Sequence, residues 1–200
     1  MADRVEMALA GSGATCGESH ADDLALVMAA RRDRDEFAHL YRRYTHQVYR
    51  YALARTGSAT VADDIVGDAM LAAFEGLARF DPARGSFSGW LFTIVHRRVT
   101  DWERGQRRGW QLLARQRAVH VGASGRDDLL DATIRRDEVA GVQAAIARLR
   151  PADREVVLLR YSAELSSEEI GHVLGVSRNA ARTRLSRALD RIANDLRDTR

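Results

Sequence analysis

The chain of 200 residues contains no lysine, a single cysteine, only two prolines and few aromatic residues. One cysteine, Cys16, excludes an intramolecular disulfide and a cysteine-rich metal site. Scarce proline together with abundant alanine, leucine and arginine favours an all-α fold. No apolar run approaches the roughly 18 residues of a membrane span, and the N-terminus lacks the apolar core of a signal peptide. These absences predict a cytoplasmic protein.

Motifs of enzymatic sites are also missing. The six histidines are scattered, and the sequence has no G-x-S-x-G, P-loop or H-E-x-x-H string. The acidic stretch ADDIVGDAM offers one exception, because Asp64 and Asp68 share a helix face beside Asp63 and paired carboxylates can hold Mg²⁺. Without a third inward carboxylate or a histidine at ligand spacing, an acidic surface near a helix N-terminus is the favoured interpretation. The sequence therefore predicts no catalysis, metal or cofactor.

Basic charge is concentrated in two separate stretches. The net charge is only +3, and all 31 basic residues are arginine. Residues 97–117 carry seven arginines against two acidic residues, and residues 176–200 carry seven against three. The rest of the chain is acidic on balance. Two basic segments in an otherwise acidic chain indicate two contacts with a polyanion such as nucleic acid.

Helical periodicity divides the chain into two blocks. From about residue 22 to 104 the apolar spacing predicts three long helices, the first ended by Gly57 and the third preceded by the loop FDPARGSF. Residues 105–135 lose this pattern, which resumes near Val139, and Pro151 suits the first turn of the following helix. We predict a mobile N-terminal tail (1–20), two all-α domains (21–108 and 137–200) and a flexible linker between them (109–136).

The second domain ends in the pattern of a helix-turn-helix, LSSEEIGHVLGVSRNAARTRLSRALDRI. Ser166 and Glu169 form a capping box, Gly175 suits the turn, and Ser177 can cap the second helix. On that helix the apolar residues share one stripe, namely Ala181, Leu185, Ala188, Leu189 and Ile192. A basic helix alone is usually a solvated surface, but its combination with a capped first helix and a three-residue turn favours reading of a DNA major groove.

The first basic segment, GSFSGWLFTIVHRRVTDWERGQRRGW, holds all three tryptophans among its arginines. Aromatic rings stack on unpaired bases while arginines hold phosphates, so the segment is a candidate single-strand site. Trp90 and Phe92 lie early in an apolar stretch, where a core position is the better interpretation. Trp102 and Trp110 lie in more polar surroundings, and core and base stacking remain open for both.

Four segments, in order, resemble a bacterial RNA polymerase sigma factor of the extracytoplasmic-function (ECF) group, which keeps only sigma domains 2 and 4. They are EFAHLYRRY, ADDIVGDAMLAAFEGLARFDP, GSFSGWLFTIVHRRVTDWERGQRR and IARLRPADREVVLLRYSAELSSEEIGHVLGVSRNAARTRLSRAL. The resemblance covers about residues 33–108 and 139–192. It implies a non-enzymatic subunit that binds core RNA polymerase, reads the −35 duplex, captures the melted −10 strand, and is commonly held by an anti-sigma factor.

The resemblance also implies three sets of contact residues. The set for core polymerase is Asp63, Asp64, Val66 and Asp68. The set for the single-stranded −10 element is Phe87, Trp90, Arg97, Arg98, Asp101 and Trp102. The set for the −35 element is Arg178, Asn179, Arg182, Thr183, Arg184, Ser186 and Arg187, most of which the helical pattern already places away from the apolar stripe.

The chain departs from the family at three places, of which the first weakens the expected docking helix and the other two leave promoter preference open. Gly67 stands where glutamine is usual, Arg97 where many members have asparagine, and Asn-Ala-Ala at 179–181 where Gly-Thr-Val is common. Two other functions are alternatives to the sigma factor. One is an autonomous helix-turn-helix regulator whose residues 22–104 bind a ligand or dimerise. The other is a metal-dependent nucleic-acid enzyme that uses Asp63, Asp64 and Asp68.

Overall fold

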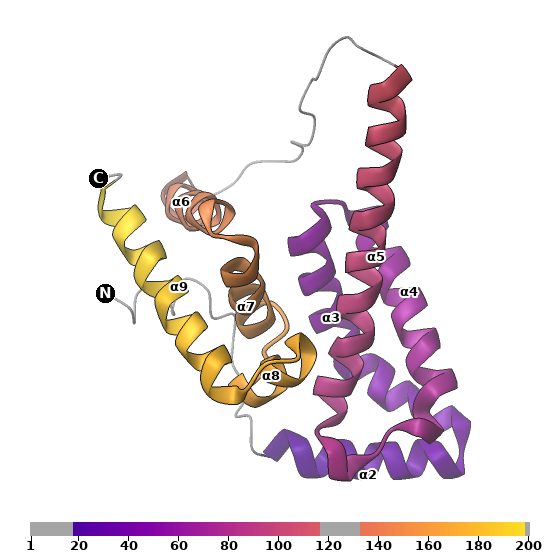
Figure 1. Ribbon diagram of the computed structural model, residues 1–200. Helices are drawn as coiled ribbons and strands as arrows, with labels where there is room; N and C mark the ends of the chain where they lie inside the picture. Colours follow the sequence, from indigo (N-terminus) through magenta and orange to yellow (C-terminus); the bar gives the residue numbers. More distant parts are fainter. Residues whose placement is uncertain (1–17, 117–132, 199–200) are drawn as a thin grey trace.

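The structure, a computed structural model, describes residues 18–116 and 133–198, and every regular element in these two ranges is helical (Figure 1). The first domain comprises the helices α2 (Glu18–Arg32), α3 (Phe37–Thr56), α4 (Ala59–Gly76) and α5 (Phe87–Gln116). The second comprises α6 (Thr133–Arg148), α7 (Pro151–Tyr161), α8 (Ser167–Leu174) and α9 (Arg178–Asp198). Three short 3₁₀ turns are η1 (Arg34–Glu36), η2 (Leu77–Arg79) and η3 (Pro82–Arg84). The predicted all-α fold is confirmed.

Local signals set the ends of the helices in the first domain. Gly57 adopts a left-handed conformation, with φ of 67°, and ends α3 where the sequence predicts it. The Ser58 side chain then accepts a hydrogen bond from the backbone N–H of Val61 and caps α4. Helices α3, α4 and α5 pack together, and α2 lies across one end of them (Figure 1). Their facing stripes form the core, which includes Leu40, Val48, Ala62, Ala69, Leu91, Phe92 and Val95.

The helix-turn-helix forms as the sequence predicts. The Ser166 side chain accepts from the Glu169 N–H at 3.2 Å, and the Glu169 carboxylate accepts from the Ser166 N–H at 2.7 Å. Gly175 ends α8 in a left-handed conformation with φ of 66°. Gly171 allows the turn to close, because a Cβ atom there would lie 2.7 Å from the carbonyl oxygen of Val176.

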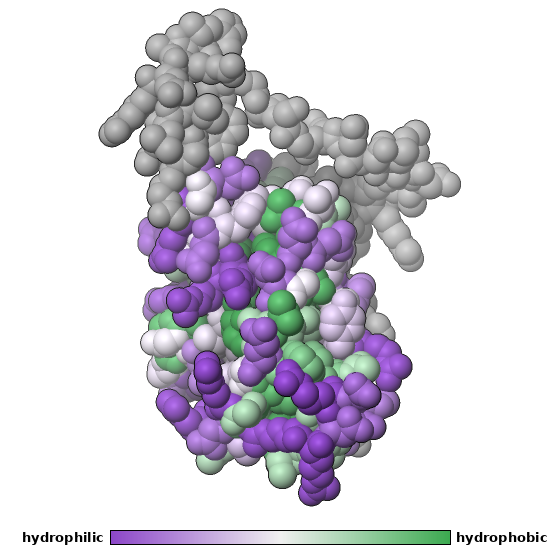
Figure 2. Space-filling view, turned by 90° about the vertical axis from the view of Figure 1, so that its right-hand side faces the viewer, coloured by the Kyte–Doolittle hydropathy of each residue, from purple (hydrophilic) through white to green (hydrophobic). Residues whose placement is uncertain are grey.

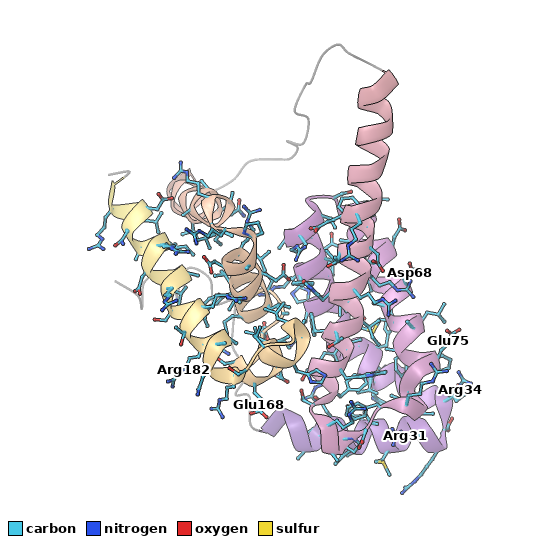
Figure 3. The ribbon with its side chains drawn as sticks, viewed as in Figure 1. Arg31, Arg34, Asp68, Glu75, Glu168 and Arg182 are labelled. Atoms are coloured by element: carbon cyan, nitrogen blue, oxygen red, sulfur yellow. The ribbon has the colours of Figure 1, made fainter. Side chains whose placement is uncertain are left out.

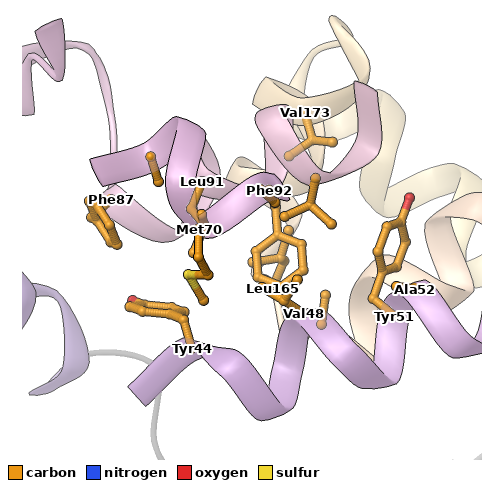
Figure 4. Close-up of a cluster of buried hydrophobic side chains, with 14 of the residues drawn as sticks. Tyr44, Val48, Tyr51, Ala52, Met70, Phe87, Leu91, Phe92, Leu165 and Val173 are labelled. Atoms are coloured by element: carbon orange, nitrogen blue, oxygen red, sulfur yellow. The ribbon is translucent and has the colours of Figure 1, made fainter. Parts of the chain in front are cut away.

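The two domains pack directly against each other. Helix α5 contacts α8, and α3 contacts α7. The close-up in Figure 4 shows Leu165 and Val173 of the second domain beside Val48 and Phe92 of the first, and these four residues belong to one buried hydrophobic cluster. The side-by-side arrangement of the domains therefore rests on a shared core.

Three predicted boundaries fall within helices of the structure. Helix α5 continues to Gln116 and α6 begins at Thr133, so residues 109–116 and 133–136 of the predicted linker are helical. The far end of α5 projects beyond the other helices (Figure 1), so it needs no apolar stripe, and its glutamine, leucine and arginine residues are good helix formers. Helix α2 begins at Glu18, inside the predicted tail. The predicted tail up to residue 17 and the linker at 117–132 lie outside the described residues.

Candidate nucleic-acid and polymerase interfaces

One face of α9 carries the predicted −35 residues and is open to solvent. Six of the seven are exposed, and Arg184 is half-buried. Ala181, Ala188 and Ile192 on the opposite stripe are buried against the rest of the domain. Arg182 projects from the outer side of α9, away from the first domain (Figure 3). The helix thus presents hydrogen-bonding and cationic side chains in a row that a DNA major groove can accept.

Of the predicted −10 residues, Phe87 is buried, Trp90 and Trp102 are half-buried, and Arg97, Arg98 and Asp101 are exposed. Phe87 is only 2% exposed, and its ring centroid lies 5.4 Å from that of Tyr44 and 5.7 Å from that of Phe80. Trp90 is half-buried, and a Cβ atom at Gly76 would lie 3.4 Å from its ring. Phe87 therefore lies in the core, where the first turn of α5 faces α3, and its role as a base contact stays a prediction.

The exposed group lies further along α5. Arg97 and Arg98 face solvent, and the Arg97 side chain is 84% exposed. Asp101 lies between two arginines, 3.9 Å from Arg97 and 3.4 Å from Arg104. Trp102 is half-buried. These side chains form a basic strip on α5, whereas the Trp110 side chain lies outside the described residues.

Helix α4 presents an acidic stripe with one apolar residue in it. Asp64, Asp68, Leu71 and Glu75 recur at spacings of four and three, and all four are exposed. Figure 3 shows Asp68 and Glu75 pointing away from the neighbouring helices. Leu71, which the sequence reasoning missed, is 57% exposed although it is a leucine. Leu71 is thus an exposed apolar side chain within a stripe of carboxylates.

Val66 does not belong to this stripe. Its side chain is 5% exposed and lies in the core, and its role as a polymerase contact stays a prediction. The burial follows from the helical period, because Val66 follows Ala62 at a spacing of four on the buried face of α4.

A pocket lies beside α4. Tyr41, Asp63 and Gly67 are among the residues that line an open pocket of about 690 Å³ between α3 and α4. Figure 2 views the molecule from the right-hand side of Figure 1, and on this face apolar and hydrophilic side chains are intermixed. Within residues 18–116 and 133–198, no group of three or more histidine, cysteine or acidic side chains could hold a metal ion.

Three glutamates of the second domain bind donors on the first. The Glu169 carboxylate accepts hydrogen bonds from the hydroxyls of Ser86, at 2.7 Å, and Ser88. The Glu164 carboxylate accepts from Arg50, at 2.8 Å. These partners are separated by 81 to 114 residues in the chain, so no local pattern could reveal them.

The third glutamate, Glu155, belongs to a buried polar cluster. It accepts from the Tyr51 hydroxyl, pairs with Arg55, and lies 3.2 Å from the Nδ1 atom of His96. Burial raises the pKa of Tyr51 to about 12, so its hydroxyl keeps its proton. Burial and the nearby Arg55 guanidinium lower the pKa of His96 below 6.5, so this ring is neutral at pH 7.

The protonation state of Glu169 follows from two opposing effects. Burial raises the pKa of its carboxyl, but hydrogen bonds from Ser88, Ser86 and the Ser166 N–H outweigh this effect and hold the pKa below its ordinary value. Glu169 is therefore a carboxylate at neutral pH. It caps α8 and binds the first domain at the same time.

Comparison with known proteins identifies both halves of the chain. The model of Sigma-70 region 2 matches residues 40–109, and that of Sigma-70 region 4 matches residues 140–192. The chain belongs to the sigma-70 family. The first domain is hereafter called the region 2 domain, and the second the region 4 domain.

The relatives indicate which group of the sigma-70 family the chain is most similar to. The ECF RNA polymerase sigma factor BldN of Streptomyces coelicolor is 30% identical over 168 residues, which span 83% of this chain and 62% of BldN. The ECF sigma factor RpoE of Cereibacter sphaeroides is 28% identical over 86% of this chain and 93% of RpoE. The solved structure of CnrH, in complex with the cytosolic domain of CnrY, has a TM-score of 0.64 and 26% identity, over 88% of this chain and 97% of CnrH.

These likenesses identify an ECF-group sigma factor. An autonomous regulator is not favoured, because the match to region 2 occupies the part of the chain where that hypothesis requires a ligand-binding or dimerisation domain. None of the helices in the described part of the sigma factor is long and apolar enough to cross a membrane.

Proposed function

We propose that this sigma factor acts as a non-enzymatic subunit that binds core RNA polymerase in the cytoplasm and directs it to a particular set of promoters. The observation that carries the proposal is the exposed polar face of α9, opposite a buried alanine and isoleucine stripe, in a chain whose two halves match sigma regions 2 and 4. In this proposal α9, α5 and α4 bind the −35 duplex, the −10 strand and core polymerase, respectively.

Helix α9 reads the −35 duplex. Arg182, Ser186 and Arg187 point outward from its central turns and supply direct contacts to base edges, where arginine pairs with guanine through two hydrogen bonds. Arg178 and Arg184 lie at the start and the flank of this face and hold phosphates. Few phosphate contacts are made, so the isolated chain is expected to bind DNA weakly, with an affinity that falls as salt is added.

The basic strip on α5 holds the melted −10 strand. Arg97 and Arg98 are exposed and neutralise phosphates, and Trp102 offers a partly open ring for stacking on a base. Arg97 replaces an asparagine that is common in the family, so the base preference at this point is expected to differ from that of the relatives.

The acidic stripe of α4 docks on core polymerase. Asp64, Asp68 and Glu75 surround Leu71, an arrangement that suits a partner surface with basic side chains around an apolar centre. Buried Val66 supports the stripe from the core side of the helix.

A protein inhibitor is the second partner that we propose. CnrH, which shares the fold at 26% identity, was solved in complex with the cytosolic domain of CnrY. By this likeness, the sigma factor is expected to be held by an anti-sigma factor until a signal releases it.

In vitro transcription tests the function. Core RNA polymerase is mixed with the purified chain and genomic DNA fragments, and the transcripts are sequenced. Start sites that share a −35 and a −10 sequence support the proposal. Tight binding of the chain alone to a palindromic duplex, without promoter opening by core enzyme, would instead indicate an autonomous regulator. Mg²⁺-dependent turnover that is lost on Asp64→Asn would indicate an enzyme.

A further inference from the structure

Helix α2 holds the connection between α4 and α5 (residues 77–86) through the side chain of Arg31. The Arg31 guanidinium donates twice to the backbone oxygen of Leu77, from Nε at 3.2 Å and from Nη2 at 3.0 Å, and Nη2 also donates to the backbone oxygen of Phe80. Figure 3 labels Arg31 at the base of the region 2 domain, beside this connection. One planar side chain thus fixes two carbonyl groups that lie three residues apart.

The two carbonyl groups mark the place where the chain leaves α4. The last carbonyl groups of a helix have no partner within the helix, and a cation near them is favoured by the helix dipole. After the turn η2, the backbone at Phe80 becomes extended, with φ of −64° and ψ of 126°. Arg31 therefore fixes both the end of α4 and the direction in which the connection starts.

The ring of Phe80 extends this constraint into the first turn of α5. It is 5% exposed, and its centroid lies 5.7 Å from that of Phe87 and 5.6 Å from that of Trp90. The Trp90 ring also packs on Gly76, where a Cβ atom would lie 3.4 Å from it. Trp90 is half-buried and is one of the predicted −10 residues. Its position therefore depends on Phe80 and, through the backbone of Phe80, on Arg31.

The other end of α2 supports the same turn of α5. Asp23 is 2% exposed, accepts a hydrogen bond from the Tyr44 hydroxyl, and lies 3.0 Å from Nε of Arg43. Burial and the Asp23 carboxylate raise the pKa of Tyr44, so its hydroxyl keeps its proton and stays a donor. The Tyr44 ring lies 5.4 Å from that of Phe87. Helix α2 thus supports the start of α5 at two places, through Tyr44 and through Arg31.

We propose that Arg31 is a positioning residue for the binding of the melted −10 strand. It fixes the connection between α4 and α5, so that Trp90 and the first turn of α5 are already in place when the strand binds. The proposal rests on the proposed function. Arg31 acts through Phe80 and does not touch DNA. Such preorganisation raises affinity, because less of the chain has to be ordered on binding.

Two substitutions of Arg31 and one control test the proposal. Arg31→Ala removes the hydrogen bonds to both carbonyl groups. Arg31→Lys keeps the positive charge but lacks the planar fork that binds two acceptors at once. Arg32→Ala is the matched control, because it removes the same charge from the next residue of α2, which is also exposed.

Each variant is assembled with core RNA polymerase and assayed on a promoter found by the transcription experiment. The probes are a fluorescein-labelled single strand with its −10 sequence and a labelled duplex with its −35 sequence. Arg31→Ala is expected to weaken binding of the single strand about tenfold, and Arg31→Lys about threefold, the range expected for lost hydrogen bonds to a charged group. The −35 duplex is expected to bind all variants as it binds wild type, and Arg32→Ala to match wild type on both probes.

The salt dependence of binding separates positioning from direct contact. Removing a side chain that neutralises one phosphate lowers the slope of log affinity against log salt by about 0.7 for a single strand. Arg31→Ala is expected to leave this slope unchanged. A lower slope, or full rescue by Arg31→Lys, would show a direct phosphate contact and overturn the proposal. An equal loss with Arg32→Ala would overturn it as well, since charge alone would then explain the effect.

Thermal melting separates positioning from folding. If Arg31→Ala lowers Tm, Phe80→Leu provides the second test, because it keeps the carbonyl group that Arg31 binds and removes the ring beside Trp90. Phe80→Leu is expected to give the same selective loss on the −10 strand, with little further loss when it is combined with Arg31→Lys. Wild-type strand binding by both Arg31→Lys and Phe80→Leu would overturn the proposal. Promoter-specific transcription by the wild-type chain is measured first, so failure of the proposed function and failure of the positioning role give different results.

Discussion

Gly67 weakens the helix that we propose docks on core polymerase, and replacing it should stabilise the protein. The residue lies in the interior of α4, is exposed, and does not have a positive φ. A Cβ atom at this position would meet nothing within 4 Å. Gly67→Ala therefore introduces no clash and removes only the entropic cost of glycine, a gain of about 1 kcal/mol in the free energy of unfolding.

The size of the thermal shift depends on the unit that unfolds. A gain of 1 kcal/mol raises Tm by about 4–8 °C in a domain of 60–100 residues and by about 2–4 °C in a unit of 150–250 residues. Because both domains contribute to one hydrophobic cluster, we expect a single transition and the smaller shift. Circular dichroism at the helix band during heating, with urea titration beside it, measures both quantities.

A matched substitution controls this prediction. Gly105 lies in α5 and is also free of neighbours within 4 Å. A rise in Tm with Gly67→Ala but none with Gly105→Ala would show that this part of α5 melts before the core does. An unchanged or lower Tm with Gly67→Ala would refute the reasoning, since it would mean that α4 needs the glycine for a reason other than helix propensity.

Three further predictions address the region 4 domain and the two interfaces. Gly171→Ala is expected to lower the free energy of unfolding, measured by urea titration, by at least about 2 kcal/mol, because the added Cβ atom would lie 2.7 Å from the Val176 carbonyl oxygen. A urea midpoint equal to that of wild type would contradict this. Arg187→Ala is expected to reduce in vitro transcription selectively, at promoters with the cognate −35 sequence, whereas an equal loss on every promoter would indicate a phosphate contact. Asp64→Arg is expected to abolish co-purification with core polymerase at an unchanged Tm, and retained co-purification would exclude the acidic stripe as the docking surface.

Local signals predicted most of the helices correctly because they act over three or four residues. The capping box of Ser166 and Glu169 and the left-handed Gly57 are examples, and both are present in the structure. The length of α5 was not predicted, because its end projects beyond the other helices (Figure 1) and the apolar spacing of the sequence is lost after about residue 104. Periodicity detects a helix through the core that it faces, so a helix that faces solvent leaves a weaker pattern.

The predicted contact residues differ in their exposure. Arg97, Arg98, Asp64 and Asp68 are exposed as a contact surface requires, and their roles stay predictions. Phe87 and Val66, taken from the same motifs, are buried. A motif specifies positions along the chain. Whether a residue at such a position is exposed depends on whether its face of the helix packs against neighbouring helices.

The sequence by itself determined the helices, the helix-turn-helix and the order of two sigma regions, because caps, turns and periodicity are local properties of the chain. Only the tertiary structure decided how the two domains meet. Glu164 reaches Arg50 across 114 residues, and Glu169 reaches Ser86 across 83. Such contacts depend on the packing of whole helices around a shared core, and no spacing in the sequence encodes them.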